Sequence, residues 1–201
     1  VTDNSRLPPE TVAKQMAEDV AKAVRWTRDH AKDYGGDPDK IFIMGHSAGA
    51  QLAAILCVVD RYLKAESVSL GIVKGCVPVD GDTYDVPSQI ANVSWWRGEI
   101  YRMKFGDEAS QKLLSAALQV QSGKSYPPLL ILHAADHPEV RTQSQKLAKV
   151  LRKVGATADA LGITGTDHPT LNAYLGHWYD EATAATFAFM KRALGASRAE
   201  N

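Results

Sequence analysis

The 201-residue chain has no excess of charge of either sign, because 23 Lys and Arg side chains balance 23 Asp and Glu side chains. Without a basic or acidic block, the chain lacks the electrostatic attraction that a nucleic acid or an anionic membrane needs in a partner. It also has no apolar run long enough to cross a bilayer, and no signal-peptide pattern at its first residues. We therefore expect no nucleic-acid partner and no membrane span.

Cysteine is scarce, since the chain contains only Cys57 and Cys76. Two cysteines are too few for a disulfide scaffold or a zinc cluster, and both lie inside apolar runs. We predict that they are buried thiols. A chain of this length can bury roughly 70% of its unfolded surface, which is enough for one hydrophobic core. With no internal repeat or linker, residues 1–201 are expected to form a single globular domain.

Short apolar runs alternate along the chain with longer amphipathic or alanine-rich segments. The short runs lack polar alternation, which is typical of parallel strands buried on both faces. Strands that alternate with helices predict an α/β fold, a mostly parallel sheet with helices on both faces, whose reactive groups gather at the carboxyl ends of the strands. The predicted strands are 41–44, 72–79, 129–132 and 157–162, the predicted helices are 8–33, 48–59, 109–120, 142–154 and 181–195, and 82–108 and 163–180 are expected to be irregular.

The strongest local motif is Gly45-His46-Ser47-Ala48-Gly49, which matches G-x-S-x-G where a predicted strand meets a predicted helix. A serine on so tight a turn adopts a strained backbone, and the flanking glycines reduce the crowding. The helix that follows directs its positive end at the same point, where the amide of Ala48 can donate to a developing oxyanion. Ser47 is therefore a candidate nucleophile, and the alternative is a serine that caps the helix.

A serine nucleophile needs a base, and the base needs a carboxylate that fixes its tautomer. Of the six histidines, His168 lies in the predicted loop after the last strand, from which it can reach the upper edge of the sheet. Asp136, just beyond the third predicted strand, is the favoured carboxylate, and Glu139 is the alternative. Asp80 follows the second strand, but its place beside a glycine favours a role in a turn. The resulting order of serine, acid and histidine is that of one class of hydrolase.

These stretches together resemble the α/β-hydrolase superfamily, in particular the bacterial esterase/lipase branch that includes feruloyl-esterase-like and kynurenine-formamidase-like enzymes. The resemblance covers nearly the whole chain, and residues 39–50 are its specific part. It implies a serine hydrolase that cleaves carboxylic esters through an acyl-enzyme, with no cofactor and no metal. The implied triad is Ser47, Asp136 and His168, with Ala48 as an oxyanion donor. The supporting stretches are 74–81, 127–133 and the loop His168-Pro169-Thr170-Leu171-Asn172.

The resemblance also implies earlier strands and a glycine-rich loop with a second oxyanion donor, which this sequence does not contain. Those strands would lie beside residues 40–45, so we expect an open sheet edge there. We therefore predict that the sequence is the C-terminal portion of a longer, N-terminally truncated enzyme, or that a second copy of the chain covers this edge. Because one oxyanion donor is worth roughly 3 kcal/mol in the transition state, the chain alone is expected to hydrolyse esters poorly.

The aromatic stretch at 82–108 resembles in position the insertion that roofs the acyl pocket in these enzymes. His46, Trp95 and Trp96 are accordingly candidate substrate contacts, although the tryptophans equally fit a role packed on the sheet. The expected partner is a small-molecule ester.

Three other functions are weighed against ester hydrolysis. An arylformamidase-type amide hydrolase would use the same residues, and a non-catalytic binding domain would keep the serine turn for structural reasons. A metal site at His133, Asp136 and His137 is the weakest alternative, because these residues lack the spacing of a helical ligand pair.

Overall fold

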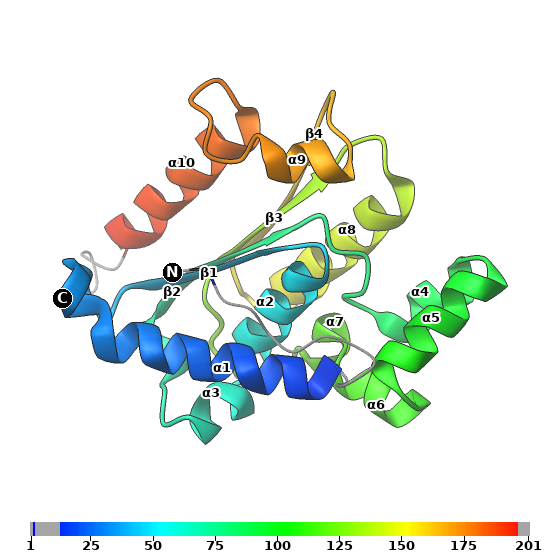
Figure 1. Ribbon diagram of the computed structural model, residues 1–201, viewed down its shortest axis with the longest axis horizontal. Coiled ribbons are helices and arrows are strands. Elements are labelled where there is room, and N and C mark those ends of the chain that lie inside the picture. The colour runs from blue at the N-terminus through cyan, green and yellow to red at the C-terminus, as the bar shows by residue number, and fades with distance from the viewer. Residues whose placement is uncertain (1, 3–12, 197–201) are drawn as a thin grey trace.

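A four-stranded parallel sheet forms the centre of the computed structural model, which describes residue 2 and residues 13–196. The strands lie in the order in which they occur along the chain, and a helical crossover connects each to the next (Figure 1). This arrangement confirms the predicted α/β fold. The strands are β1 (Ile41–His46), β2 (Val73–Val79), β3 (Leu129–Ala134) and β4 (Ala158–Ile163).

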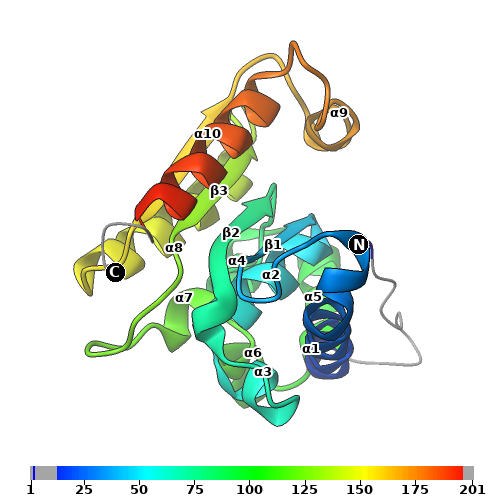
Figure 2. The ribbon, with the colours of Figure 1, turned by 90° about the vertical axis from the view of Figure 1, so that its left-hand side faces the viewer.

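Helices cover both faces of the sheet, and Figure 2 shows α1 and α10 on opposite sides of it. On one face, α1 (Ala13–His30), α2 (Ala48–Val58) and α8 (Pro138–Lys153) enclose the larger hydrophobic core. On the other face, α10 (Glu181–Ala196) packs through Phe189 against a smaller core that includes Val77 and Leu130. Since both faces are covered, the strands are apolar without alternation.

Cys57 and Cys76 lie in the larger core as buried free thiols, which confirms the prediction. Burial, reinforced by the neighbouring Cys57, raises the pKa of the Cys76 thiol well above its ordinary value. The Cys76 thiol therefore stays protonated and unreactive.

The segment 82–108, expected to be irregular, folds into two helices, α4 (Val86–Asn92) and α5 (Trp95–Phe105). A third helix that the sequence did not predict is α9 (His168–Ala173), in the segment expected to be a loop. The helices α4 and α9 are short and each is capped by an aspartate, so local capping rather than apolar periodicity specifies them, whereas α5 has 11 residues and no side-chain cap. The other helices are α3 (Arg61–Ala65), α6 (Glu108–Leu113) and α7 (Ala116–Gln119), and 3-10 turns occur at Ala31–Tyr34 and Leu70–Ile72.

Several predicted boundaries also shift. The helix expected at 109–120 is divided into α6 and α7, and α8 begins at Pro138, where proline is favoured in a first helical turn. The helix expected at 8–33 is observed from Ala13, and residues 8–12 lie outside the described part of the chain.

Pro78 is the residue before the last in β2, which is a central strand of the sheet. The amides of Cys76 and Asp80 donate to the carbonyls of Pro128 and Leu132, but Pro78 between them has no N–H to donate. One rung of the ladder between β2 and β3 is therefore missing.

Strand β1 lies at the edge of the sheet and pairs only with β2 among the described residues, as the sequence predicted. A groove of about 610 Å³ runs along this edge and is walled by α1. Its lining includes Met16 and Val20 of α1 and Met44 of β1, which is 41% exposed. Among the described helices, none has the length and apolarity needed to span a membrane.

Candidate active site

Ser47 occupies a sharp turn between β1 and α2. Its backbone has φ 57° and ψ −117°, a conformation that residues with a side chain rarely adopt and that costs roughly 1–3 kcal/mol. Two hydrogen bonds hold the turn: the amide of Ser47 donates to Val79 O at 2.9 Å, and the amide of Ala50 donates to Ser47 O at 3.0 Å. The sheet and the helix thus fix the strained serine from both sides.

Gly45 is required by the close approach of the strand to the helix. A Cβ atom at this position would lie 2.3 Å from the carbonyl oxygen of Gly49, a distance at which the backbone must move. A Cβ atom at Gly49 would meet no atom within 4 Å. Both glycines belong to the G-x-S-x-G motif, but only Gly45 is needed to avoid a steric clash.

The side chains of Ser47, His168 and Asp80 form a continuous hydrogen-bonded chain. His168 Nε2 lies 3.0 Å from Ser47 Oγ, and His168 Nδ1 lies 2.6 Å from Asp80 Oδ2. Because a carboxylate only accepts, Nδ1 carries the hydrogen, and the lone pair of Nε2 faces the serine hydroxyl. The base is therefore in the tautomer that can remove a proton from Ser47.

Asp80 is buried, with an exposed fraction of 1%, and follows β2 with a left-handed φ of 53°. Its second carboxylate oxygen, Oδ1, accepts a hydrogen bond from the amide of Ala134 at 2.8 Å. Both oxygens thus have an N–H donor, which is what a buried carboxylate needs.

The expectation that Asp136 orients His168 is wrong in this structure, because Asp80 makes that contact. Asp136 lies in the turn after β3, two strands away from β1, and its side chain is exposed. Glu139, the alternative carboxylate, lies in the first turn of α8 and forms an ion pair with Arg97. The signal that pointed to Asp80 was its place directly after an apolar strand, but the sequence does not tell which strand lies beside β1.

Ala48 is the first residue of α2, so its amide has no carbonyl one turn earlier to accept from it. The positive end of the helix dipole lies at the same place, next to Ser47. A negative oxygen formed beside Ser47 Oγ would meet this amide, as the sequence predicts.

The three candidate substrate contacts lie in two places, His46 beside His168 and the two tryptophans on the surface of α5. The ring of His46 lies against that of His168, with centroids 4.4 Å apart. Trp95 and Trp96, at the start of α5, are 79% and 60% exposed. Side chains so exposed are not packed on the sheet.

A polar cluster ties α5 to the loops at the carboxyl edge of the sheet. Arg97 forms ion pairs with Glu139 at 2.8 Å and with Asp82 at 3.5 Å. The hydroxyl of Tyr101 also donates to Asp82. Burial, together with this hydrogen bond, raises the pKa of Tyr101 to about 12. These contacts anchor α5 to Asp82, which lies two residues after Asp80.

The metal site considered at His133, Asp136 and His137 does not assemble. His133 is buried with its Nδ1 3.0 Å from Ala134 O, whereas Asp136 is exposed. Within the described residues, the side chains close enough to share an ion are His46, Asp80 and His168, whose ligand atoms lie within 4.8 Å. Asp80 and His168 bond to each other there, so the arrangement is already satisfied without an ion.

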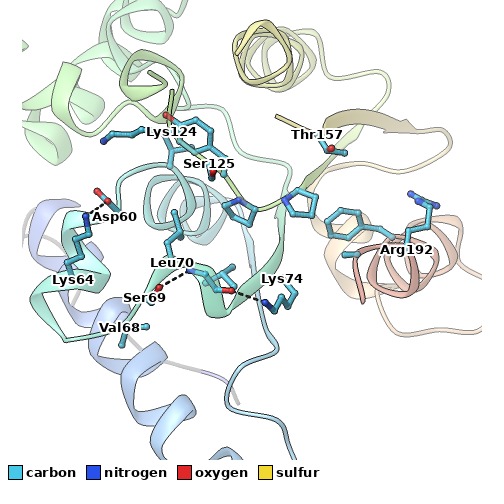
Figure 3. A pocket seen from close by; sticks show the side chains of 18 of the residues that line it. Asp60, Lys64, Val68, Ser69, Leu70, Lys74, Lys124, Ser125, Thr157 and Arg192 are labelled. Carbon is cyan, nitrogen blue, oxygen red and sulfur yellow. Dashed lines mark hydrogen bonds and ion pairs between the residues drawn. The ribbon is translucent and has the colours of Figure 1, made fainter. Parts of the chain in front are cut away.

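A large cavity, drawn in Figure 3, lies at the amino ends of the strands, the opposite end of the sheet from Ser47. It has a volume of about 1160 Å³ and is lined by residues that precede the strands, including Leu70, Pro127 and Thr157. Figure 3 shows Lys74 and Arg192 at its margin, pointing in different directions. The size of a cavity therefore does not lead to Ser47 and His168, which lie at the carboxyl ends of the strands.

The fold and the serine turn define a class, and the chain belongs to the alpha/beta hydrolase fold family, whose model matches residues 4–172. It is homologous to carboxylic ester hydrolases. Over 148 residues it is 34% identical to esterase LipQ of Mycobacterium tuberculosis, a match that covers 69% of this chain and 34% of the relative. Over 175 residues it is 25% identical to isoprenylcysteine alpha-carbonyl methylesterase ICME of Arabidopsis thaliana, covering 81% of this chain and 41% of the relative.

Solved structures share the fold. A truncated form of a carbohydrate esterase from gut microbiota superimposes with a TM-score of 0.76 at 23% identity, over 96% of this chain and 73% of that one. Esterase B from Lactobacillus rhamnosis gives a TM-score of 0.77 at 20% identity, over 98% and 68%. The chain thus spans less than half of the curated relatives' length and about two thirds to three quarters of these structures.

Proposed function

We propose that this chain carries the catalytic triad of a serine hydrolase of carboxylic esters, formed by Ser47, His168 and Asp80. The observation that carries the proposal is the pair of contacts at His168, 3.0 Å to Ser47 Oγ and 2.6 Å to Asp80 Oδ2. Nucleophile, base and orienting carboxylate lie within hydrogen-bond reach of one another, as nucleophilic catalysis by serine requires.

In the proposed mechanism, Ser47 Oγ attacks the ester carbonyl carbon while His168 Nε2 takes its proton. The carbonyl oxygen becomes negative, and the amide of Ala48 donates to it at the end of α2. When the tetrahedral intermediate collapses, the bond to the alcohol breaks and the imidazolium gives its proton to the leaving oxygen. A water molecule then repeats these steps on the acyl-enzyme, which releases the acid and restores Ser47.

The substrate class follows from the relatives together with the site. Both curated relatives described above are named as esterases, and one of them as a methylesterase that acts on isoprenylcysteine. The proposed nucleophile and base are partly exposed rather than enclosed, so the site admits an ester from solvent. We propose carboxylic esters in general and assign no particular acyl or alcohol group.

Labelling with a fluorophosphonate, followed by mass spectrometry, tests the proposal directly, because the probe reacts with an activated serine. We expect stoichiometric modification of Ser47 in the wild-type chain and no modification at position 47 in Ser47→Ala, which has no hydroxyl to bond to the phosphorus of the probe. Hydrolysis of p-nitrophenyl acetate by the same two proteins provides a second measurement. A correctly folded wild-type chain that the probe leaves unmodified would favour a non-catalytic binding domain.

An arylformamidase-type amide hydrolase is the second candidate, since it would use the same three residues. The ratio of kcat/KM for phenyl acetate to that for N-formylaniline separates the two functions. We expect the ester to be preferred, and a preference for the formanilide would replace the ester proposal.

A further inference from the structure

His46 contacts the proposed base through both its ring and its hydrogen-bonding edge. His46 Nε2 lies 3.0 Å from the main-chain oxygen of His168, and the two rings lie 4.4 Å apart at an interplanar angle of 36°. A carbonyl oxygen only accepts a hydrogen bond, so Nε2 of His46 carries the hydrogen. The residue before the nucleophile thus holds the main chain of the residue that must accept the nucleophile's proton.

The position of His168 in the chain explains why such a contact matters. His168 is the first residue of α9, a helix of six residues that follows a turn and is capped by Asp167. A helix this short is marginal by itself. The ring of His168 is held by Asp80, whereas its main chain is held to β1 by His46. The two bonds together fix the distance and the direction of Nε2 toward Ser47.

The charge of His46 is compatible with this position. Partial burial, and next the neighbouring His168, lower the pKa of His46 below its ordinary value. The charged and titratable groups that act on this ring are His168 from α9 and Asp80 from the end of β2. A neutral His46 does not repel the imidazolium that His168 becomes during the proposed reaction.

We infer that His46 is a positioning residue that fixes His168 for proton transfer through its hydrogen bond to the main chain. This inference rests on the proposed function, because it assigns a partner to the proposed base. It assigns His46 a role different from the substrate contact that the sequence led us to expect. Its effect is on the rate of serine activation, and it leaves the affinity for substrate unchanged.

Two substitutions of His46 separate the effect of its hydrogen bond to the main chain of His168 from the effect of its ring contact. His46→Phe keeps an aromatic ring beside His168 but has no donor, whereas His46→Gln keeps an amide N–H near the place of Nε2. We expect the rate of Ser47 labelling by a small fluorophosphonate, and kcat for p-nitrophenyl acetate, to fall about tenfold in His46→Phe and to stay within about threefold in His46→Gln. KM should be unchanged in both variants. Circular dichroism and thermal unfolding of the three proteins establish that they are folded.

A long-range ¹H–¹⁵N spectrum of the wild-type histidines tests the same contact without a substitution. We expect His46 in the Nε2–H tautomer at pH 7.5, and the Nδ1–H tautomer would overturn the inference. An increase in KM without a change in kcat, or equal losses in His46→Phe and His46→Gln, would also overturn it. Wild-type protein that the probe does not label would overturn the proposed function, whereas equal labelling of wild type and His46→Phe would overturn this inference alone.

Discussion

At the scale of single residues, two aspartates of similar sequence context have opposite environments. Asp80 is buried and accepts hydrogen bonds from His168 Nδ1 and from the amide of Ala134, whereas Asp136 is exposed in a turn. Each follows an apolar strand by one or two residues. Burial and partners, which depend on the three-dimensional arrangement, distinguish an orienting carboxylate from a surface charge.

This contrast provides a matched pair of variants. Asp80→Asn presents an amide to Nδ1, which favours the wrong tautomer of His168, so we expect kcat/KM for p-nitrophenyl acetate to fall by ~10³ to 10⁴-fold. Asp136→Asn should stay within about threefold of the wild type, as expected for an exposed side chain. The reverse ranking, with both variants folded, would assign the orienting role to Asp136.

Tyr101 provides a test by titration. Its pKa is about 12, raised by burial and by its hydrogen bond to Asp82. The pKa of Tyr101 in the folded state lies above the unfolded value near 10. Its neutral hydroxyl therefore stabilises the folded state fully below pH ~10, and this contribution is lost as the pH rises toward 12. In a pH titration followed by tyrosinate absorbance at 295 nm, we expect the wild type to show a step near pH 12 that Tyr101→Phe lacks. In Asp82→Asn that step should move to lower pH yet stay above 10, because burial remains.

At the scale of elements, the turn between β1 and α2 depends on only one of its two glycines. In Gly45→Ala the new Cβ meets the backbone of Gly49, so we expect a loss of about 1–3 kcal/mol in the free energy of unfolding. In Gly49→Ala the Cβ meets nothing, and alanine favours a helix over glycine by about 1 kcal/mol, so stability should be equal or higher. Urea denaturation measures both, and similar losses in the two variants would contradict this account.

The main elements are predictable from the sequence, and the short ones are not. Strands such as 129–132 and the helix after Ser47 are identified by apolar runs whose length and composition leave one solution. Capping by Asp85 and Asp167 determines the short helices α4 and α9, whereas α5 has no capping side chain and lacks a regular apolar stripe. The sequence predicted Ser47 and His168 as partners, and the structure brings their side chains within 3.0 Å, but the contact of His168 with Asp80 depends on the order of the strands, which the sequence does not give.

At the scale of the whole molecule, the two ends of the sheet have different chemistry. The proposed triad lies at the carboxyl ends, and the large cavity with Lys124 and Arg192 lies at the amino ends. Lys124 and Arg192 lie at the opposite end of the sheet from Ser47. We therefore expect the fluorophosphonate to label Ser47 in Lys124→Ala and in Arg192→Ala at rates within about twofold of the wild type. A tenfold loss in either folded variant would show that the two ends are coupled.

The backbone hydrogen bond that is missing at Pro78 weakens the connection between β2 and β3, and thus between the two halves of the sheet. One half of the sheet leads from β1 to Ser47, the proposed nucleophile, and the other half leads from β4 to His168, the proposed base at the start of α9. Asp80 extends from the first half, and its carboxylate grips both Ala134 and His168 on the second. The Asp80 carboxylate therefore also joins the two halves of the sheet at the place where a backbone hydrogen bond is missing. Loss of its hydrogen bonds would increase the distance between Ser47 and His168.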